Sequence, residues 1–230
     1  MPANQHIWVA SYPKSGNTWV RFLVSNLIFG PIKDSQSIEQ MIPDIHRPLE
    51  GLKIYRFHNT IFMKTHWKYD PEIRERFPTR GVIYIVRNPL DVIASHINYF
   101  GLKDGSRQQE RAAFVDTFIQ NAGHPRWFRF KMGSWIENVE SWALNNLDFP
   151  RLVLRYEDLK SDTHEAVRKI ARFLSLEKSP EEIDQAVRLS SFDALKSIEE
   201  KEIDGRKSGF FSTEHRHKGD AGYRFMNQGK

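Results

Sequence analysis

Cysteine is absent from this 230-residue chain, which excludes disulfides, thiolate catalysis and zinc sites built on cysteine. Long apolar runs are missing as well: none approaches the roughly 20 residues that span a bilayer. The N-terminus lacks the basic-then-apolar pattern of a secretion signal. The nine histidines form no HExxH pattern and no close cluster with carboxylates, so we expect no metal site. These absences predict a soluble, cytoplasmic protein.

The composition that remains is that of a folded domain with a basic surface. Hydrophobic residues make up 40% of the chain, including 16 Phe and 6 Trp, which is ample for a core and excludes wholesale disorder. The net charge of +5 suits a polyanionic ligand, but the basic residues are spread along the chain and form no basic tail. The length predicts a single domain over residues 1–230.

Residues 7–29 have the pattern of a strand, a tight turn and a helix. The apolar run 7–10 is stopped by Pro13, Gly16 is free to take a positive φ, and hydrophobic residues recur at helical spacing from about Asn17 onward. Such a turn presents the N–H groups of a helix N-terminus to an anion. The sequence therefore predicts a phosphate-binding loop whose side chains add Lys14, Ser15, Asn17 and Thr18.

This loop does not follow the Walker pattern GxxxxGK[ST], because its lysine precedes the glycine and no earlier glycine opens it. By itself it could also be an ordinary turn with a solvated lysine.

The rest of the chain alternates strands and helices without internal repeats. Apolar, strand-like runs occur at 60–65, 81–86 and 152–154. The second has the continuous pattern of a central parallel strand, and we expect the third to be buried as well. We predict one α/β domain with a central parallel sheet and helices on both faces, in a P-loop-like nucleotide-binding topology. Predicted helices cover 71–77, a segment from 89, 134–147, 162–174, 180–189 and 192–200.

Three connections are long and polar. We expect little regular structure in 30–53, a lid that folds over a site in 100–131, and a flexible loop in 201–217.

Polar side chains follow three of the predicted strands, and the carboxyl ends of parallel strands meet at one edge of a sheet. Lys14 follows the first strand, Lys64 and His66 end the second, and Arg87 ends the third. Nearby cations favour the neutral form of a histidine, which a general base needs. Alternatives remain open at this point: His66 could be a buried, hydrogen-bonded histidine, and Arg87 could pair with Asp91 or Glu157.

Several segments in this order resemble the motifs of the cytosolic-type sulfotransferases, which use 3′-phosphoadenosine 5′-phosphosulfate (PAPS). They are YPKSGNTW (12–19), KTH (64–66), RNPLDVIAS (87–95), GSWIENVESW (133–142), YEDL (156–159), SFDALK (191–196) and HKGDAGYR (217–224). Each motif is weak alone, but the ordered set covers most of the chain. The resemblance implies sulfuryl transfer from PAPS without a metal, leaving adenosine 3′,5′-bisphosphate (PAP).

The resemblance also implies roles for individual residues. His66 would take the proton of the acceptor, Lys64 would help neutralise the transferring group, and Lys14 would stabilise the leaving group. The loop residues that would bind the nucleotide are Lys14, Ser15, Gly16, Asn17, Thr18 and Trp19. The 3′-phosphate would be bound by Arg87, Ser95, His217, Lys218 and Gly219. The adenine would be contacted by Trp19, Tyr156, Ser191 and Phe192.

The acceptor side is less defined. We expect the acceptor to be a small molecule or natural product. Its pocket would be lined by Trp67, Tyr69, Phe100, Trp127 and Phe128, with Phe130 beside them. The chain departs from the family pattern at Asn17, Trp67, His217 and Tyr223, and the family's usual dimer motif is not found, although a homodimer remains possible.

Two other functions compete with sulfuryl transfer. A P-loop-type kinase would need the Walker pattern and an Asp pair for Mg²⁺, which the sequence lacks. A nucleic-acid-binding protein would concentrate its 34 Lys and Arg residues in a basic stripe, whereas 29 acidic residues are interspersed here. We therefore expect no nucleic-acid partner.

Overall fold

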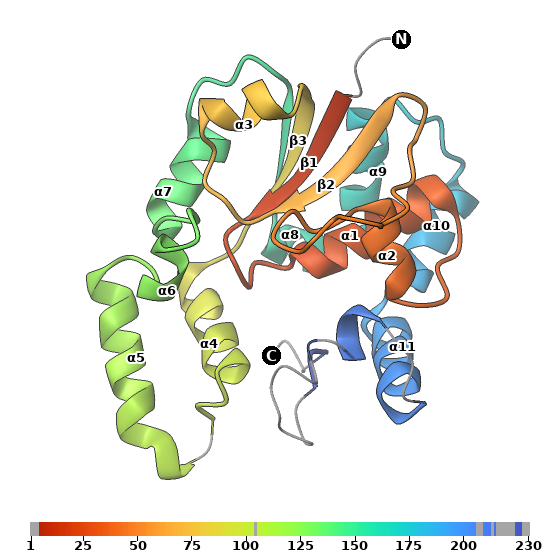
Figure 1. Ribbon diagram of the computed structural model, residues 1–230. Coiled ribbons are helices and arrows are strands. Elements are labelled where there is room, and N and C mark those ends of the chain that lie inside the picture. The colour runs from red at the N-terminus through yellow and green to blue at the C-terminus, as the bar shows by residue number, and fades with distance from the viewer. Residues whose placement is uncertain (1–4, 104, 206–208, 213, 215–223, 227–230) are drawn as a thin grey trace.

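Four parallel strands form the central sheet of the computed structural model, which describes residues 5–103, 105–205, 209–212, 214 and 224–226 (Figure 1). The strands are β1 (Gln5–Ser11), β2 (Thr60–Thr65), β3 (Thr79–Val86) and β4 (Arg151–Arg155), in the spatial order β2-β1-β3-β4. Every neighbouring pair is parallel, so all four carboxyl ends lie at the same edge. The predicted single parallel sheet with helices on both faces is confirmed.

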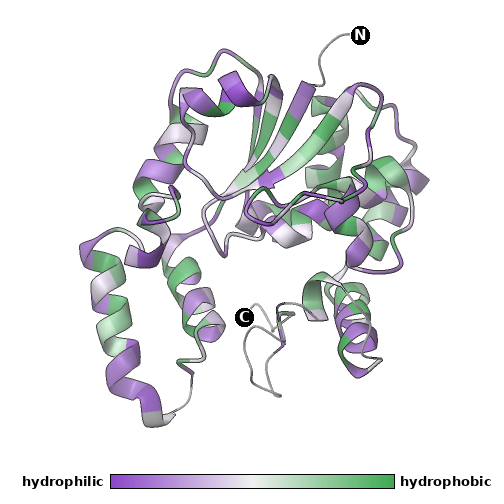
Figure 2. Cartoon of the chain, in the orientation of Figure 1, coloured by the Kyte–Doolittle hydropathy of each residue, from purple (hydrophilic) through white to green (hydrophobic). Residues whose placement is uncertain are grey.

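Alternate side chains of the strands pack into two separate cores, one on each face of the sheet. Ile7 and Val9 of β1 pack under α1 (Asn17–Phe29), α9 (Thr163–Phe173) and α10 (Pro180–Leu189). Trp8 and Ala10 point the other way, toward α3 (Pro71–Arg76) and the helix formed by α7 (Trp135–Val139) and the π-helical η2 (Glu140–Leu144). Hydrophobic residues accordingly concentrate in the strands between the helical layers (Figure 2).

Further helices complete the described fold. They are α2 (Gln36–Met41), α4 (Pro89–Tyr99), η1 (Gly105–Arg107), α5 (Gln108–Gln120), α6 (Pro125–Phe128), α8 (Tyr156–Ser161) and α11 (Phe192–Asp204). Helix starts follow the local sequence: Asp70 caps α3 as predicted, and Ser134 and Ser179 form capping boxes with Glu137 and Glu182.

The polar connections contain more structure than their composition predicts. Residues 30–53 include α2, because buried Ile38 anchors it to the core. Lys201–Asp204 continue α11 where a loop was expected, and Phe211 is buried in parallel stacking with Phe22 of α1. Those parts of the loop prediction are wrong.

β4 was expected to be buried, but it is an edge strand with only Leu154 fully covered, and Val153 is 39% exposed. The segment 100–131 contains η1, α5 and α6; its role as a lid stays a prediction. Within the described residues, no helix is both long and apolar enough to cross a membrane.

Candidate active site

The loop between β1 and α1 has the geometry of an anion-binding turn. Lys14 and Gly16 both take positive φ values, 70° and 98°, and Gly16 is the N-cap of α1. The first N–H groups of a helix have no acceptor within it, so those of α1 point out of its N-terminus into this loop. Lys14 Nζ lies 4.5 Å from the ring centre of Tyr99 and 4.7 Å from that of Phe225.

Two buried hydrogen-bond donors at this loop, Ser15 Oγ and Arg87 Nε, lack a partner among the described residues, as does the acceptor Asn17 Oδ1. Ser15 is fully buried. A buried donor without a partner is costly, and such atoms occur where a ligand completes the bonding. Both can donate to phosphate oxygens, so the donor set fits a phosphorylated ligand.

Arg87 leads from the end of β3 to the phosphate loop. Its Nη1 donates to the carbonyl of Lys14 over 3.1 Å, and its guanidinium lies 4.2 Å from the ring centre of Tyr156. Neither alternative ion pair of Arg87, with Asp91 or with Glu157, is present among the described residues. The Glu157 carboxylate accepts from the backbone N–H of Asn88. The structure thus joins the motifs at 12–19, 87–95 and 156–159 at one place.

The side chain of Asn17 was expected to donate to a phosphate, but the structure gives it other partners. Its Nδ2 donates to the carbonyl of Val9 over 3.0 Å and to Ser11 Oγ over 3.2 Å, both in β1. The side chain therefore fastens α1 to the strand, and only the backbone N–H of Asn17 remains at the helix N-terminus.

His66 follows β2 and contacts the end of β1. Its Nδ1 lies 2.7 Å from the carbonyl oxygen of Ser11, which can only accept, so Nδ1 carries the proton and Nε2 holds a lone pair. Burial lowers the pKa of His66 well below 6.5, and the charge of Lys64 lowers it further. The histidine is therefore neutral at pH 7, in the tautomer that can accept a proton at Nε2.

Lys64 has a partner that the sequence motifs did not reveal. Its Nζ donates to Asp44 Oδ2 over 2.8 Å, and both side chains are buried. Burial alone would raise the pKa of Asp44, but the charges of Lys64 and Arg21 outweigh it and keep the carboxyl ionised. The lysine head group is thus held against a carboxylate.

Two further residues near His66 were missed by sequence reasoning. His46 Nε2 accepts from the backbone N–H of His66, and Asn138 Nδ2 donates to its carbonyl. Asn138 Oδ1 in turn accepts from the hydroxyl of buried Tyr84. The available signals were the Pro43–Pro48 spacing around His46, and the place of Asn138 within the segment GSWIENVESW.

The predicted adenine-side residues lie around the N-termini of α1, α8 and α11. The indole N–H of Trp19 donates to the carbonyl of Ser190, and its ring meets Tyr156 edge-on with centroids 5.8 Å apart. Ser191 caps α11, and Phe192 beside it is 38% exposed. Ser95 is half-buried on α4. His217, Lys218 and Gly219 lie outside the described residues.

Three of the predicted acceptor residues share one hydrophobic cluster: Trp127 is buried in it, and Trp67 and Phe100 pack against it. Trp67 lies beside the histidines, perpendicular to His46 with ring centres 5.3 Å apart. Tyr69 packs against Trp142 and Phe149 in the core under α7. Phe100 and Trp127 pack around the buried imidazole of His96, which accepts the indole N–H of Trp127, whereas Phe128 and Phe130 are exposed.

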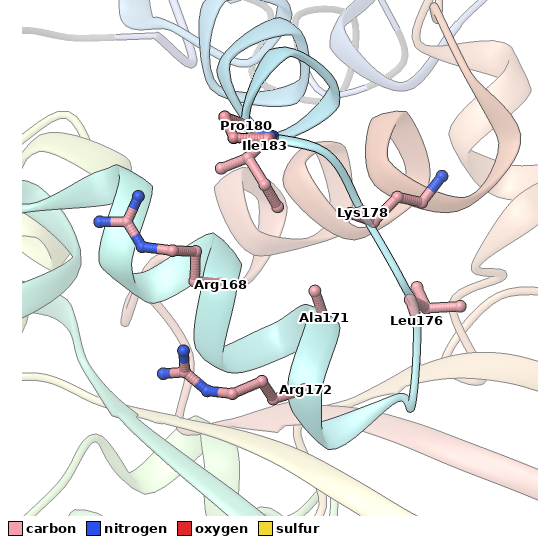
Figure 3. Close-up of a pocket in the computed structure, with 7 residues that line it drawn as sticks. All are labelled: Arg168, Ala171, Arg172, Leu176, Lys178, Pro180 and Ile183. Atoms are coloured by element: carbon pink, nitrogen blue, oxygen red, sulfur yellow. The ribbon is translucent and has the colours of Figure 1, made fainter.

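Two surface pockets lie away from the predicted nucleotide-binding and catalytic residues. One of about 450 Å³ is lined by Pro125, Arg126, Arg129 and Phe130. The other, of about 250 Å³, lies between α9 and α10 (Figure 3). Its cations are already paired, because Arg168 and Arg172 both bind Glu165 and Lys178 binds Glu182. Neither pocket contains a residue of the predicted nucleotide or catalytic site.

A parallel sheet with an anion-binding turn after its first strand, and basic side chains at the same edge, defines a P-loop-like nucleotide-binding protein. The comparison with protein families is more specific. Residues 4–222 match the sulfotransferase domain, and the chain belongs to this family. The resemblance found in the motifs is confirmed.

Individual relatives are distant but extensive. The chain is 26% identical to an amine sulfotransferase of Oryctolagus cuniculus over 198 residues, which is 84% of this chain and 63% of the relative. It is 29% identical to flavonol 3-sulfotransferase of Flaveria bidentis, covering 92% of this chain and 70% of that protein. Mouse sulfotransferase SULT7A1 complexed with PAP superimposes with a TM-score of 0.62 at 28% identity, covering 84% and 66% of the two chains.

Proposed function

We propose that this protein transfers the sulfuryl group of PAPS to a hydroxyl or amine of a small-molecule acceptor. One observation carries the proposal: the ends of three strands converge. His66, after β2, binds the carbonyl of Ser11 at the end of β1, and Arg87, after β3, binds the carbonyl of Lys14 three residues further on. A candidate base and a phosphate-binding loop thus lie at one edge of the sheet.

Sulfuryl transfer, like phosphoryl transfer, needs in-line positioning and charge stabilisation more than covalent participation by the protein. The unpartnered donors of Ser15 and Arg87, together with the N-terminus of α1, would hold the phosphates. Lys14 would stabilise the negative charge that develops on the leaving 5′-phosphate. PAP bound to the structural relative supports this choice of nucleotide.

The proton has a defined route. As the acceptor oxygen or nitrogen forms its bond to sulfur and the bond between sulfur and the 5′-phosphate oxygen breaks, the acceptor proton moves to Nε2 of His66. The bond from His66 Nδ1–H to Ser11 leaves Nε2 available for this role. Lys64 would act through its field on the transferring group rather than as a free cation, because Asp44 binds its ammonium.

Calorimetry with PAP in the absence of Mg²⁺ tests the nucleotide assignment. We expect micromolar binding that Lys14→Ala and Arg87→Ala abolish and that Lys33→Ala, which removes an exposed lysine, leaves unchanged. Binding of ATP that requires Mg²⁺, without binding of PAP, would instead indicate a kinase.

Turnover tests the base. With radiolabelled PAPS and a panel of phenols, amines, sterols and glycans, His66→Ala should keep the PAP affinity and lose about 10²–10⁴-fold in kcat. Transfer at the wild-type rate by this variant would refute the role of His66. The acceptors that the panel identifies define the substrate class.

A further inference from the structure

We propose that His46 is a positioning residue for the reaction: it holds the backbone of His66 and thereby fixes the direction in which the His66 imidazole presents Nε2. The inference rests on the proposed function, because it takes His66 as the base. No sequence motif includes His46, which lies 20 residues before His66 in a connection that was expected to be irregular.

The contact between the two histidines is direct. The backbone N–H of His66 donates to Nε2 of His46 over 2.8 Å, so that nitrogen must be unprotonated. Burial and then the charge of Lys64 lower the pKa of His46 to about 4, which keeps it neutral at pH 7. The two rings lie nearly parallel, at 16° and 5.9 Å between centres, and Trp67 meets the His46 ring at 90°.

The segment that carries His46 pairs with β2 through an isolated parallel bridge between Asp44 and Lys64. The backbone N–H of Lys64 donates to the carbonyl of Pro43, and the N–H of Ile45 donates to the carbonyl of Lys64, so this segment runs parallel beside β2. The carboxylate of Asp44 accepts from both Lys64 Nζ and the backbone N–H of His46. The buried ion pair therefore also fixes the position of His46.

Three groups together define the position of His66. His46 holds its N–H, Asn138 holds its carbonyl over 2.9 Å, and the carbonyl of Ser11 holds Nδ1–H. The residue lies just past the end of β2, where the peptide would otherwise lack a neighbouring strand to bind its N–H. Without His46 this peptide can rotate, and a shift of about 1 Å at a catalytic group can cost about 100-fold in rate.

The test compares two substitutions of similar size. His46→Gln keeps an acceptor oxygen for the His66 N–H, whereas His46→Leu removes it. We expect His46→Leu to lower kcat by about 10- to 100-fold, with the dissociation constant of PAP changed by less than about threefold. His46→Gln should recover kcat to within about fivefold of the wild type. His164→Ala, which removes a surface histidine on α9, is the control and should match the wild type.

Equal kcat for the Gln and Leu variants would overturn the proposal. If His46→Leu does not fold, His46→Ala takes its place under the same criterion. Nitrogen-15 NMR of the imidazoles gives a readout that does not depend on turnover: the Nδ1–H tautomer of His66 should persist in His46→Gln and become mixed in the variant without an acceptor. A wild-type tautomer in both variants would contradict positioning by His46. Activity retained by His66→Ala would instead overturn the base assignment on which the inference rests.

Discussion

Replacing Gly16 by alanine should destabilise the phosphate loop through two separable effects. The first is conformational: Gly16 has φ 98° and ψ 13°, and a residue with a Cβ loses about 1–2 kcal/mol in the left-handed region. The second is steric: a Cβ at this position would lie 2.5 Å from Cδ2 and 2.8 Å from Cε2 of Tyr156. Displacing a packed ring adds about 1–3 kcal/mol.

Together these terms predict a loss of about 2–5 kcal/mol in the free energy of unfolding, or about 4–20 °C in Tm. Gly51→Ala is the matched control, because Gly51 has φ 74° and a Cβ added there would have no neighbouring atom within 4 Å, so only the conformational term applies. The displaced Tyr156 ring also lies on Arg87, so the PAP affinity of Gly16→Ala should fall as well.

Urea denaturation of a double-mutant cycle isolates the steric term. In a Tyr156→Ala background the ring is gone, and Gly16→Ala should cost no more than Gly51→Ala. If Gly16→Ala and Gly51→Ala lower the free energy of unfolding equally in the wild-type background, the close packing of Tyr156 on the loop is refuted.

Four further outcomes follow from the geometry. Ser15→Ala should leave the unfolding free energy within about 1 kcal/mol of wild type, because the hydroxyl lacks a described partner, yet weaken PAP binding about tenfold by calorimetry; unchanged affinity would contradict its role. Asp44→Asn leaves Lys64 buried without its counter-charge and should cost about 3–5 kcal/mol in urea denaturation; a loss below about 1 kcal/mol would argue against the pair. The free energy of unfolding should fall as the pH is lowered from about 6.5 to about 4, because His46 binds a proton in the unfolded chain but, with its lowered pKa, stays neutral in the folded protein. His46→Gln should flatten this dependence of the unfolding free energy on pH. An unchanged dependence would contradict the lowered pKa of His46. Residues 100–131 should gain protection from hydrogen exchange when nucleotide and acceptor are both bound, and equal protection would exclude a lid.

Local pattern was enough to predict the phosphate loop and most elements. A strand stopped by Pro13, a glycine at positive φ and a helix from Asn17 depend on residues within a few positions of each other, and the structure has all three. Continuous apolar runs likewise identified β2 and β3, because a strand covered on both faces needs no alternation. β4 was misjudged because a run of three apolar residues does not tell an edge strand from a central one.

Polar segments were the weak point. Residues 30–53 and 201–217 have little hydrophobic periodicity, so no pattern in them predicted α2 or the burial of Phe211. Both are stabilised by contacts with α1, which lies outside these segments: Arg21 bonds to the carbonyl of Ile42, and Phe22 stacks on Phe211.

The sequence by itself determined the order of the strands and of most helices, the phosphate loop and the candidate for the base, since each depends on short-range pattern or a contiguous motif. Only the tertiary structure decided what surrounds that histidine. Asp44 meets Lys64 and His46 meets His66 across 20 residues, and Asn138 reaches His66 across 72. These contacts arise because parallel pairing brings the segment with Asp44 and His46 to the carboxyl end of β2, where α7 also lies. No local sequence pattern predicts which side chains meet there.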